Sequence, residues 1–360
     1  MPKDLSVYRG CFLGMAIGDA MGYTADEMSL EDIYAEFGPN GLLGYDLRNG
    51  TAAVTSYTQV AAYVTNGLLL YVTRGKPGTQ VPFVTLAMRE WAKRQHFPRD
   101  PSRSMCWVSQ KPELRRKLCR DARMLDAMRF EKLGTPEKPI NSASTPGAIL
   151  SGAVLGLFFD PARMDPWQIG ELAVQTVSLT HGDPEAFLSA AVLGYTIAGI
   201  VQEPEHRLQD QFSQAIDVVQ GQFGGKYPQA KDLAEMLKQA IAMANRAGTE
   251  PQGDMEKLYC GTAGQCLAGA IYACLTSHED FDTAMITAVN HSGKSAAVAA
   301  ITGAVLGAVL TEEGLPDFYL ESLEPAGVLR VLAEDLAQGS PARGLFDDDW
   351  DHKYNQGLPL

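Results

Sequence analysis

Four glycines near the N-terminus recur at a constant spacing of four residues: Gly10, Gly14, Gly18 and Gly22. Residues four apart lie on one face of an α-helix, and each glycine inside a helix costs about 1 kcal/mol relative to alanine. A helix face made of glycine is therefore expected where another backbone approaches very closely. A second face of small residues, Ala299, Gly303 and Gly307, has the same spacing and is the best candidate to pack against the first.

Apolar residues recur at three- and four-residue spacing along most of the chain, which is typical of amphipathic helices. Besides the two glycine-bearing helices, this pattern predicts helices over residues 60–71, 81–93, 147–158, 166–179, 184–201, 210–221, 230–247 and 264–276. Alternating strand patterns are scarce, and no linker rich in Ser, Gly or Pro divides the chain. The sequence therefore predicts an all-α fold in which residues 1–360 form a single domain, with a surface excursion at about residues 95–146.

The charge balance argues against some classes of partner. Lys and Arg together number 30 and Asp and Glu number 43, which gives a formal net charge of −13. Such an acidic chain is a poor nonspecific ligand for nucleic acid or an anionic membrane, and its most apolar stretch, residues 295–310, is too short to span a bilayer. The six cysteines form no CxxC pair and have no histidine at zinc spacing. We therefore expect a cytoplasmic protein with reduced thiols and with neither a nucleic-acid nor a membrane partner.

Several local patterns each have a plain structural interpretation beside a functional one. Gly293-Lys294-Ser295 matches the end of a phosphate-binding P-loop, but Ala288 stands where that motif needs glycine. His181 precedes a predicted helix, where it is either a general base or ligand or, more commonly, a hydrogen-bonding residue of a turn. The basic run at residues 95–123 is interpreted as a solvated loop. An acidic cluster near the C-terminus suits either a hard cation or a solvated tail: Asp347, Asp348, Asp349 and Asp351.

Several segments, taken in order, resemble one protein family. The glycine-spaced segment at residues 10–22 is similar to the opening helix of the ADP-ribosylglycohydrolases, the family of the dinitrogenase reductase-activating glycohydrolase and its crystallin relatives. Further similarities follow in the expected order, at residues 37–41, 54–59, 179–182 and 288–297 and in the tail around Trp350 and Tyr354. The resemblance covers essentially the whole chain, and it identifies Gly293-Lys294-Ser295 as part of a degenerate metal motif rather than a P-loop.

The resemblance implies a single orthogonal multi-helix domain of the ADP-ribosylglycohydrolase type, with a pair of Mg²⁺ ions held by carboxylates between helix ends. In active members the ions hold the ribose hydroxyls and activate water, since hard divalent cations bind clustered carboxylate oxygens. Carried over residue by residue, the resemblance implies a ligand-binding cleft formed by Asp19, Asp26, Thr55, Ser56, Tyr57, His181, Asn290, His291, Ser292, Lys294 and Ser295.

The metal ligands of the family are largely missing from this chain. Four positions where the family has aspartates carry other residues: Ser56, Tyr57, Lys294 and Ala296. Thr55 matches the first ligand, Ala297 replaces a hydroxyl-bearing one, and Asp26, a catalytic candidate, replaces a glutamate. Two Mg²⁺ ions would bring four positive charges with almost no carboxylate to balance them, and unpaired charge in a partly dehydrated cleft is expensive. We therefore predict that the metal site is lost and that no cofactor is bound.

Three functions from different classes are compatible with this pattern. The first is a catalytically silent ligand-binding or regulatory pseudoenzyme, whose ligand is ADP-ribose or a related nucleotide or phosphate-bearing molecule. The second is an active hydrolase of ADP-ribose-type N- or O-glycosidic bonds with a rebuilt, metal-poor site. The third is a structural or interaction protein without a ligand. We favour the first, and we predict that Lys294 points into the former metal cleft and is neutralised by Asp26, Asp19 or a phosphate-like anion.

Overall fold

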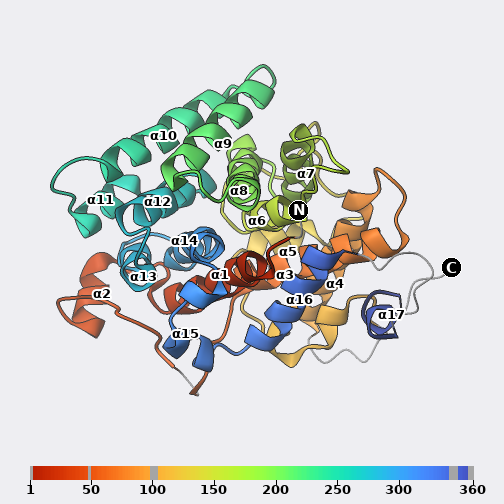
Figure 1. Cartoon of the computed structure of the whole chain (residues 1–360), viewed down its shortest axis with the longest axis horizontal. Coiled ribbons are helices and arrows are strands. Elements are labelled where there is room, and N and C mark those ends of the chain that lie inside the picture. The colour runs from red at the N-terminus through yellow and green to blue at the C-terminus, as the bar shows by residue number, and fades with distance from the viewer. Residues whose placement is uncertain (1–2, 48–49, 98–103, 340–347, 356–360) are drawn as a thin grey trace.

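The computed structural model describes residues 3–47, 50–97, 104–339 and 348–355. These residues form seventeen α-helices and no β-strand, only two isolated bridges (Ala52 with Leu323 and Thr135 with Lys138). The all-α prediction is therefore confirmed (Figure 1). The helices are α1 (Leu5–Ala25), α2 (Leu30–Phe37), α3 (Ser56–Arg74), α4 (Gln80–His96), α5 (Ala122–Ala127), α6 (Ser151–Phe158), α7 (Trp167–Ser178), α8 (Pro184–Gln202), α9 (Leu208–Phe223), α10 (Gln229–Ala244), α11 (Pro251–Leu258), α12 (Ala263–Thr276), α13 (Phe281–Val289), α14 (Ser295–Leu310), α15 (Asp317–Ser322), α16 (Ala326–Gln338) and α17 (Asp348–Tyr354).

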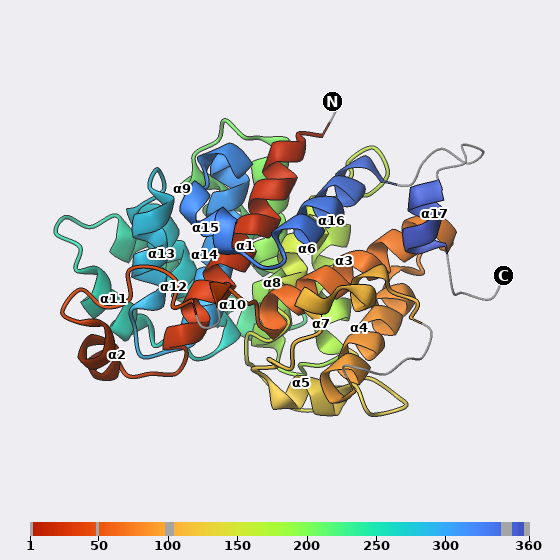
Figure 2. The same ribbon diagram turned by 90° about the horizontal axis from the view of Figure 1, so that it is seen from below.

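The predicted packing of the two small-residue faces is confirmed. α1 and α14 run antiparallel through the middle of the molecule, with α9–α12 on one side and α3–α5 on the other (Figures 1 and 2). A Cβ atom built on each glycine of α1 would fall 1.9 to 2.4 Å from a backbone oxygen of α14. The opposed pairs are Gly10 with Gly307, Gly14 with Gly303, Gly18 with Ala299, and Gly22 with Ser295. Backbone contact this close explains why glycine is needed along the whole face.

Ten helices are predicted from the sequence, and all ten are present. The eight with predicted bounds have ends within four residues of those bounds, and α1 begins five residues before Gly10. The seven that were not predicted are α2, α5, α11, α13, α15, α16 and α17. Six of these have nine residues or fewer, too short for a periodic pattern to be distinctive. The exception is α16, with 13 residues, whose buried Val328, Leu329, Leu332 and Leu336 form a regular apolar stripe that could have identified it.

The segment predicted as a surface excursion, at about residues 95–146, lies only partly at the surface. It contains two 3₁₀ turns, η2 (Trp107–Gln110) and η3 (Pro112–Leu114), followed by α5. The backbone N–H of Ser56 donates to the Leu118 carbonyl (3.0 Å), so the segment covers the N-terminal end of α3. Its buried apolar side chains include Trp107, Val108, Leu114 and Met124. Part of the basic run is therefore packed against the start of α3, and the interpretation of the whole run as a solvated loop is wrong for that part.

One helix of the described chain, α8, is long and apolar enough to cross a membrane by its length and composition alone. Of its most apolar 18-residue window, 72% is buried inside the structure. It packs against α6, α7 and α9, as a core helix does. The apolar residues of α8 are therefore accounted for by packing within this chain.

Candidate functional site

The C-terminal end of α1 and the N-terminal ends of α3 and α14 meet at one place, which we call the helix-end site. It comprises the charged or polar residues Asp19, Asp26, Glu27, Thr55, Ser56, Arg120 and Lys294. The antiparallel pairing of α1 with α14 places residues 19–27 beside residues 294–296. The segment before α5 contributes Arg120. The tertiary structure thus brings together five of the eleven residues predicted to line a cleft, Asp19, Asp26, Thr55, Ser56 and Lys294, and adds Glu27 and Arg120.

Asp19 serves as an anchor for the start of α3. Its fully buried carboxylate accepts hydrogen bonds from the backbone N–H groups of Thr55 and Thr58 (3.0 Å each) and from their hydroxyls (2.6 and 2.7 Å). Burial raises the pKa of Asp19 to about 6, against the opposing effect of these four hydrogen bonds. Because all its oxygens are engaged within the fold, Asp19 is not a partner of Lys294, and this part of the prediction is wrong.

Asp26 is held by an arginine that the sequence analysis did not single out. The Asp26 side chain is 1% exposed, and its Oδ2 accepts from Nε (2.9 Å) and a terminal nitrogen (2.8 Å) of Arg120. Its Oδ1 accepts from the backbone N–H of Ala296 in the first turn of α14 (3.2 Å). Burial raises the pKa of Asp26, while Arg120 and the Ala296 amide oppose that shift. The signal in the sequence is the basic run at residues 95–123, which contains Arg120; the interpretation of this run as a solvated loop is wrong at that residue.

Lys294 is neutralised by Glu27, not by the predicted Asp26 or Asp19. The Lys294 ammonium lies 2.5 Å from Glu27 Oε1, and Glu27 Oε2 lies 3.9 Å from Arg120. Glu27 has a φ of 66°, which is uncommon for a residue other than glycine, and its N–H donates to the Gly293 carbonyl (3.1 Å). The hydrogen bond and charge of Lys294 lower the pKa of Glu27. Two carboxylates and two cations therefore form a cluster without net charge.

The donor set of the helix-end site does not fit a pair of magnesium ions. Ser56 Oγ accepts from the backbone N–H of Arg120 (3.0 Å), Thr55 Oγ1 donates to Asp19, and Ala296 contributes only its backbone. Tyr57 is buried, and burial raises its pKa well above the usual value, so it offers no phenolate. No group of three or more His, Cys, Asp or Glu side chains placed to hold a metal ion occurs within residues 3–47, 50–97, 104–339 and 348–355. Hard cations need clustered carboxylate oxygens, and here guanidinium and ammonium groups lie beside the carboxylates instead.

The remaining candidates from residues 290–295 hold loops together. Asn290 Oδ1 accepts from the Leu42 N–H (2.8 Å), and its Nδ2 donates to the Leu42 carbonyl (2.9 Å). Ser292 Oγ accepts from the Leu30 N–H (2.9 Å), and Ser295 Oγ donates to the Val289 carbonyl (2.9 Å). These hydrogen bonds hold the loop that precedes α14 in place and so set the position of Lys294.

His291 is buried with both ring nitrogens in use. Nδ1 accepts from the Gly293 N–H (3.0 Å), which leaves Nε2 to donate to the Ala288 carbonyl (3.0 Å). This pattern requires the neutral ring, because the charged form has no acceptor. Burial lowers the pKa of His291 to about 4. The histidine is therefore part of the loop's framework and carries no charge at neutral pH.

This burial predicts how His291 affects stability with pH. Its pKa in the folded state, about 4, is below the ordinary 6.5, so between these values the unfolded state binds more protons. Stability should therefore fall as the pH drops from 6.5 to 4, by about 3 kcal/mol from this group alone. Urea unfolding of the parent and of His291→Gln across this range checks it, since the variant lacks the titration but keeps a donor and an acceptor. Identical pH profiles for the two proteins would contradict the assignment.

His181 belongs to a separate buried cluster. Its Nε2 lies 3.0 Å from Asp121 Oδ2 and its Nδ1 lies 2.8 Å from the Thr180 hydroxyl, while the Thr145 hydroxyl donates to the same Asp121 oxygen. Burial acts to raise the pKa of Asp121, but the contacts with His181 and Thr145 prevail and hold it below the usual range. Because both ring nitrogens are occupied and the side chain is fully buried, the structure favours the hydrogen-bonding role for His181.

The two other local patterns also have structural explanations. Residues 281–289, before Gly293-Lys294-Ser295, form helix α13 instead of the strand that a P-loop requires. In the acidic cluster, Asp347 lies outside the described residues. Asp349 pairs with the largely buried Lys353 (2.7 Å), which also binds Asp335 (2.7 Å) and so ties α17 to α16.

Comparisons with known proteins agree with this architecture. The family model described as ADP-ribosylglycohydrolase matches residues 1–345. A solved structure titled "ADP-ribosylglycohydrolase-related protein complex" contains a similar chain, with a TM-score of 0.56 and 19% sequence identity over 94% of this chain and 99% of that chain. At this identity the likeness shows the fold alone. No curated protein matches the chain.

Proposed function

This chain belongs to the ADP-ribosylglycohydrolase family, and we propose that it is a member without metal-dependent hydrolysis that acts by binding a phosphate-bearing ligand. The observation that carries the proposal is the pairing of Asp26 with Arg120 and of Glu27 with Lys294. In active members, metal ions orient the ribose and activate water. Here protein cations neutralise the carboxylates, so the charge that would attract such ions is already balanced.

The same cluster supports an anionic ligand. The Lys294 side chain is 17% exposed and that of its partner Glu27 is 59% exposed, so Glu27 is the member that an incoming anion displaces most easily. With Glu27 displaced, Arg120, Lys294 and Asp26 carry a net positive charge. Ammonium and guanidinium groups form strong charge-assisted hydrogen bonds with phosphate oxygens. ADP-ribose or a related nucleotide is the ligand class that fits both this chemistry and the family. The net charge of −13 supports a protein with neither a nucleic-acid nor a membrane partner, and the six free cysteines support a cytoplasmic location.

We predict no tight divalent-metal site. Calorimetric titration of the intact chain with Mg²⁺ or Mn²⁺ should give no sub-millimolar isotherm, because Arg120 and Lys294 repel a cation and Asp26 is already paired. The matched variant combines Arg120→Ala with Lys294→Asp, which removes two positive charges and adds one carboxylate. If the site can bind a divalent ion at all, the double variant should bind it more tightly than the parent does.

The same samples test catalysis. The parent should release no ADP-ribose from arginine- or serine-linked substrates above the buffer rate, with or without magnesium. A stoichiometric two-ion isotherm, or magnesium-dependent turnover that survives repurification, would establish instead an active hydrolase with a rebuilt site.

We also predict that Lys294 binds the ligand and contributes little to stability. The Glu27 side chain in its ion pair is largely exposed, and water weakens the attraction between the two charges. Lys294→Ala should therefore lower the free energy of unfolding by at most about 1 kcal/mol. The variant should weaken ADP-ribose binding by about five- to tenfold, and Glu27→Gln should strengthen it by a similar factor, because the competing anion is gone. Calorimetric titration measures both effects.

A matched control is Glu31→Gln, which removes an exposed charge from nearby α2 and should leave ADP-ribose binding unchanged. If neither the parent nor Glu27→Gln binds ADP-ribose or pyrophosphate, the ligand-binding proposal is wrong and a structural or interaction protein is the better conclusion.

A further inference from the structure

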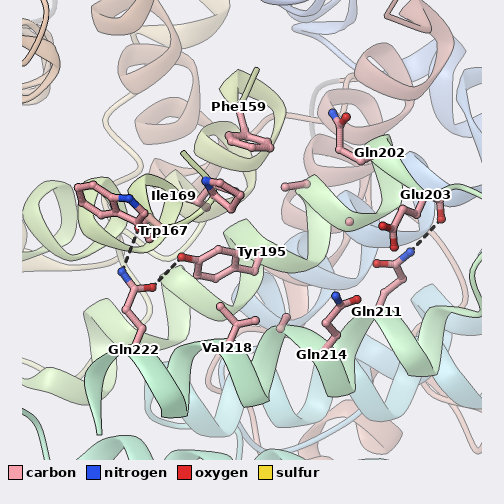
Figure 3. Close-up of a pocket in the computed structure, with 14 residues that line it drawn as sticks. Phe159, Trp167, Ile169, Tyr195, Gln202, Glu203, Gln211, Gln214, Val218 and Gln222 are labelled. Atoms are coloured by element: carbon pink, nitrogen blue, oxygen red, sulfur yellow. Dashed lines mark hydrogen bonds between the residues drawn. The ribbon is translucent and has the colours of Figure 1, made fainter. Parts of the chain in front are cut away.

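A second candidate site lies away from the helix-end site, between α7, α8 and α9. It is a pocket of about 360 Å³, and none of these three helices contributes to the helix-end site. Figure 3 shows the Trp167 and Tyr195 rings toward one end, with the Gln222 amide hydrogen-bonded to both residues, and a group of amide and carboxylate side chains toward the other end: Gln202, Glu203, Gln211 and Gln214. Concave, mostly apolar pockets with a few placed polar groups are the usual form of small-molecule sites.

The aromatic end is rigidly built. Phe159 and Ile169 are 5% and 2% exposed and form its floor. The Tyr195 hydroxyl donates to Gln222 Oε1 (2.7 Å), and Gln222 Nε2 donates to the Trp167 carbonyl (3.0 Å), so the position of the Tyr195 ring is fixed (Figure 3). The Trp167 side chain is largely exposed at the rim. Aromatic faces attract apolar groups and cations alike.

The polar end carries the pocket's only formal charge. Glu203 directly follows α8 and lines the pocket, and none of the lining residues, all of which the structure describes, is a lysine or arginine. Glu203 Oε2 lies 2.7 Å from the exposed His206, which does not line the pocket. Gln211, which is 3% exposed, uses its Nε2 to donate to the Glu203 carbonyl (2.9 Å). A carboxylate and amide oxygens at this end favour a ligand that donates hydrogen bonds.

We propose that this pocket binds an organic cation, an ammonium group carried on an aryl or alkyl body. The body would lie against Phe159, Ile169 and Tyr195, and the ammonium group would face Glu203. An anionic ligand meets no compensating cation among the lining residues, and a wholly apolar one would strip water from the carboxylate without replacing its hydrogen bonds. The net charge of −13 adds a general attraction for cations. This site is independent of the function proposed for the helix-end site.

A matched series of probes tests the proposal on the intact chain. Calorimetric titration with 2-phenylethylamine, 2-phenylethanol and 3-phenylpropionate compares a cation, a neutral molecule and an anion on similar bodies. The amine should bind about five- to tenfold more tightly than the alcohol, and the anion should not bind. Equal or tighter binding of the alcohol, or no saturation by the amine at about 10 mM, would overturn the proposal.

Variants then locate the binding. Glu203→Gln should reduce amine affinity to that of the alcohol, whereas Glu205→Gln, which removes the same charge from an exposed residue outside the lining, should not. Gly199→Ala should weaken all binding, because its Cβ would lie 2.0 Å from Gln211 Oε1 and push that amide into the pocket. Equal effects of the two glutamate variants would show a long-range charge effect and refute the site. Dimerisation of the chain that Trp167→Ala abolishes would assign the pocket to a second copy instead.

Discussion

Gly14→Ala should lower the free energy of unfolding by about 3 kcal/mol or more, although alanine is the better helix former by about 1 kcal/mol. The added methyl group would lie 2.1 Å from the Gly303 carbonyl oxygen and 3.2 Å from the Gly307 Cα atom. Both are backbone atoms of α14, so no side-chain rotation can relieve the overlap. The two central helices would have to separate, and the buried contacts along their whole length would loosen.

A second glycine provides the control with the opposite sign. Gly221 lies within α9, is exposed, and a Cβ built there meets nothing within 4 Å. Gly221→Ala should therefore raise the free energy of unfolding by up to about 1 kcal/mol. Urea unfolding followed by circular dichroism measures both variants under one set of conditions. Stabilisation by Gly14→Ala of the same size as by Gly221→Ala would show that the close α1–α14 contact is absent.

Arg120→Ala should lower the free energy of unfolding by about 2–3 kcal/mol. Among the described residues, the buried Asp26 carboxylate then keeps only the Ala296 amide as a hydrogen-bond partner. Removing one partner of a buried ion pair is destabilising because the remaining charge is left buried without compensation. Because the arginine is partly exposed, water weakens its attraction to Asp26, and the expected loss of stability is smaller than for a fully buried ion pair. Without Arg120 the pKa of Asp26 rises further. The deficit should therefore shrink as the pH is lowered, because a protonated Asp26 needs no cation.

Two further variants separate this effect from simple truncation of an arginine. Arg120→Lys should recover part of the loss, since lysine keeps the charge but lacks the fork that reaches Asp26 through two nitrogens. Arg207→Ala breaks an ion pair to Asp210 that also uses two nitrogens but is fully exposed, and should leave stability close to that of the parent. Thermal and urea unfolding between pH 5 and pH 8 decides the matter. A pH-independent deficit in Arg120→Ala would show that the Asp26 pair does not determine it.

Much of the fold could be predicted because its causes are local or periodic. The spacing of Gly10, Gly14, Gly18 and Gly22 predicted a helix that touches another backbone, and Ala299, Gly303 and Gly307 identified the partner. The apolar repeats predicted most long helices within a few residues. The order of the matching segments also indicated the family that the family model later matched.

The contacts of the helix-end site could be predicted only in part. The sequence alone shows that four positions where the family has aspartates carry other residues: Ser56, Tyr57, Lys294 and Ala296. It also shows the positive charge of Lys294. The partner of Lys294 could not be predicted from the sequence. Glu27, which pairs with it, has an unusual positive φ that periodicity does not predict. Asp19 is a candidate in the sequence because the glycine-spaced helix that carries it is expected to pack against the helix after Lys294, yet the start of α3 takes up all its oxygens.

The sequence by itself determined that helices pack on glycine faces, that the chain is acidic, and that carboxylates expected for a metal pair are missing. Only the tertiary structure decided which charges replace them. Arg120 lies 94 residues from Asp26 and Lys294 lies 267 residues from Glu27. The pairing of such distant charges depends on the paths of the loops, which are fixed by long-range packing. Helix periodicity, in contrast, is a property of neighbouring residues and is therefore visible in the sequence alone.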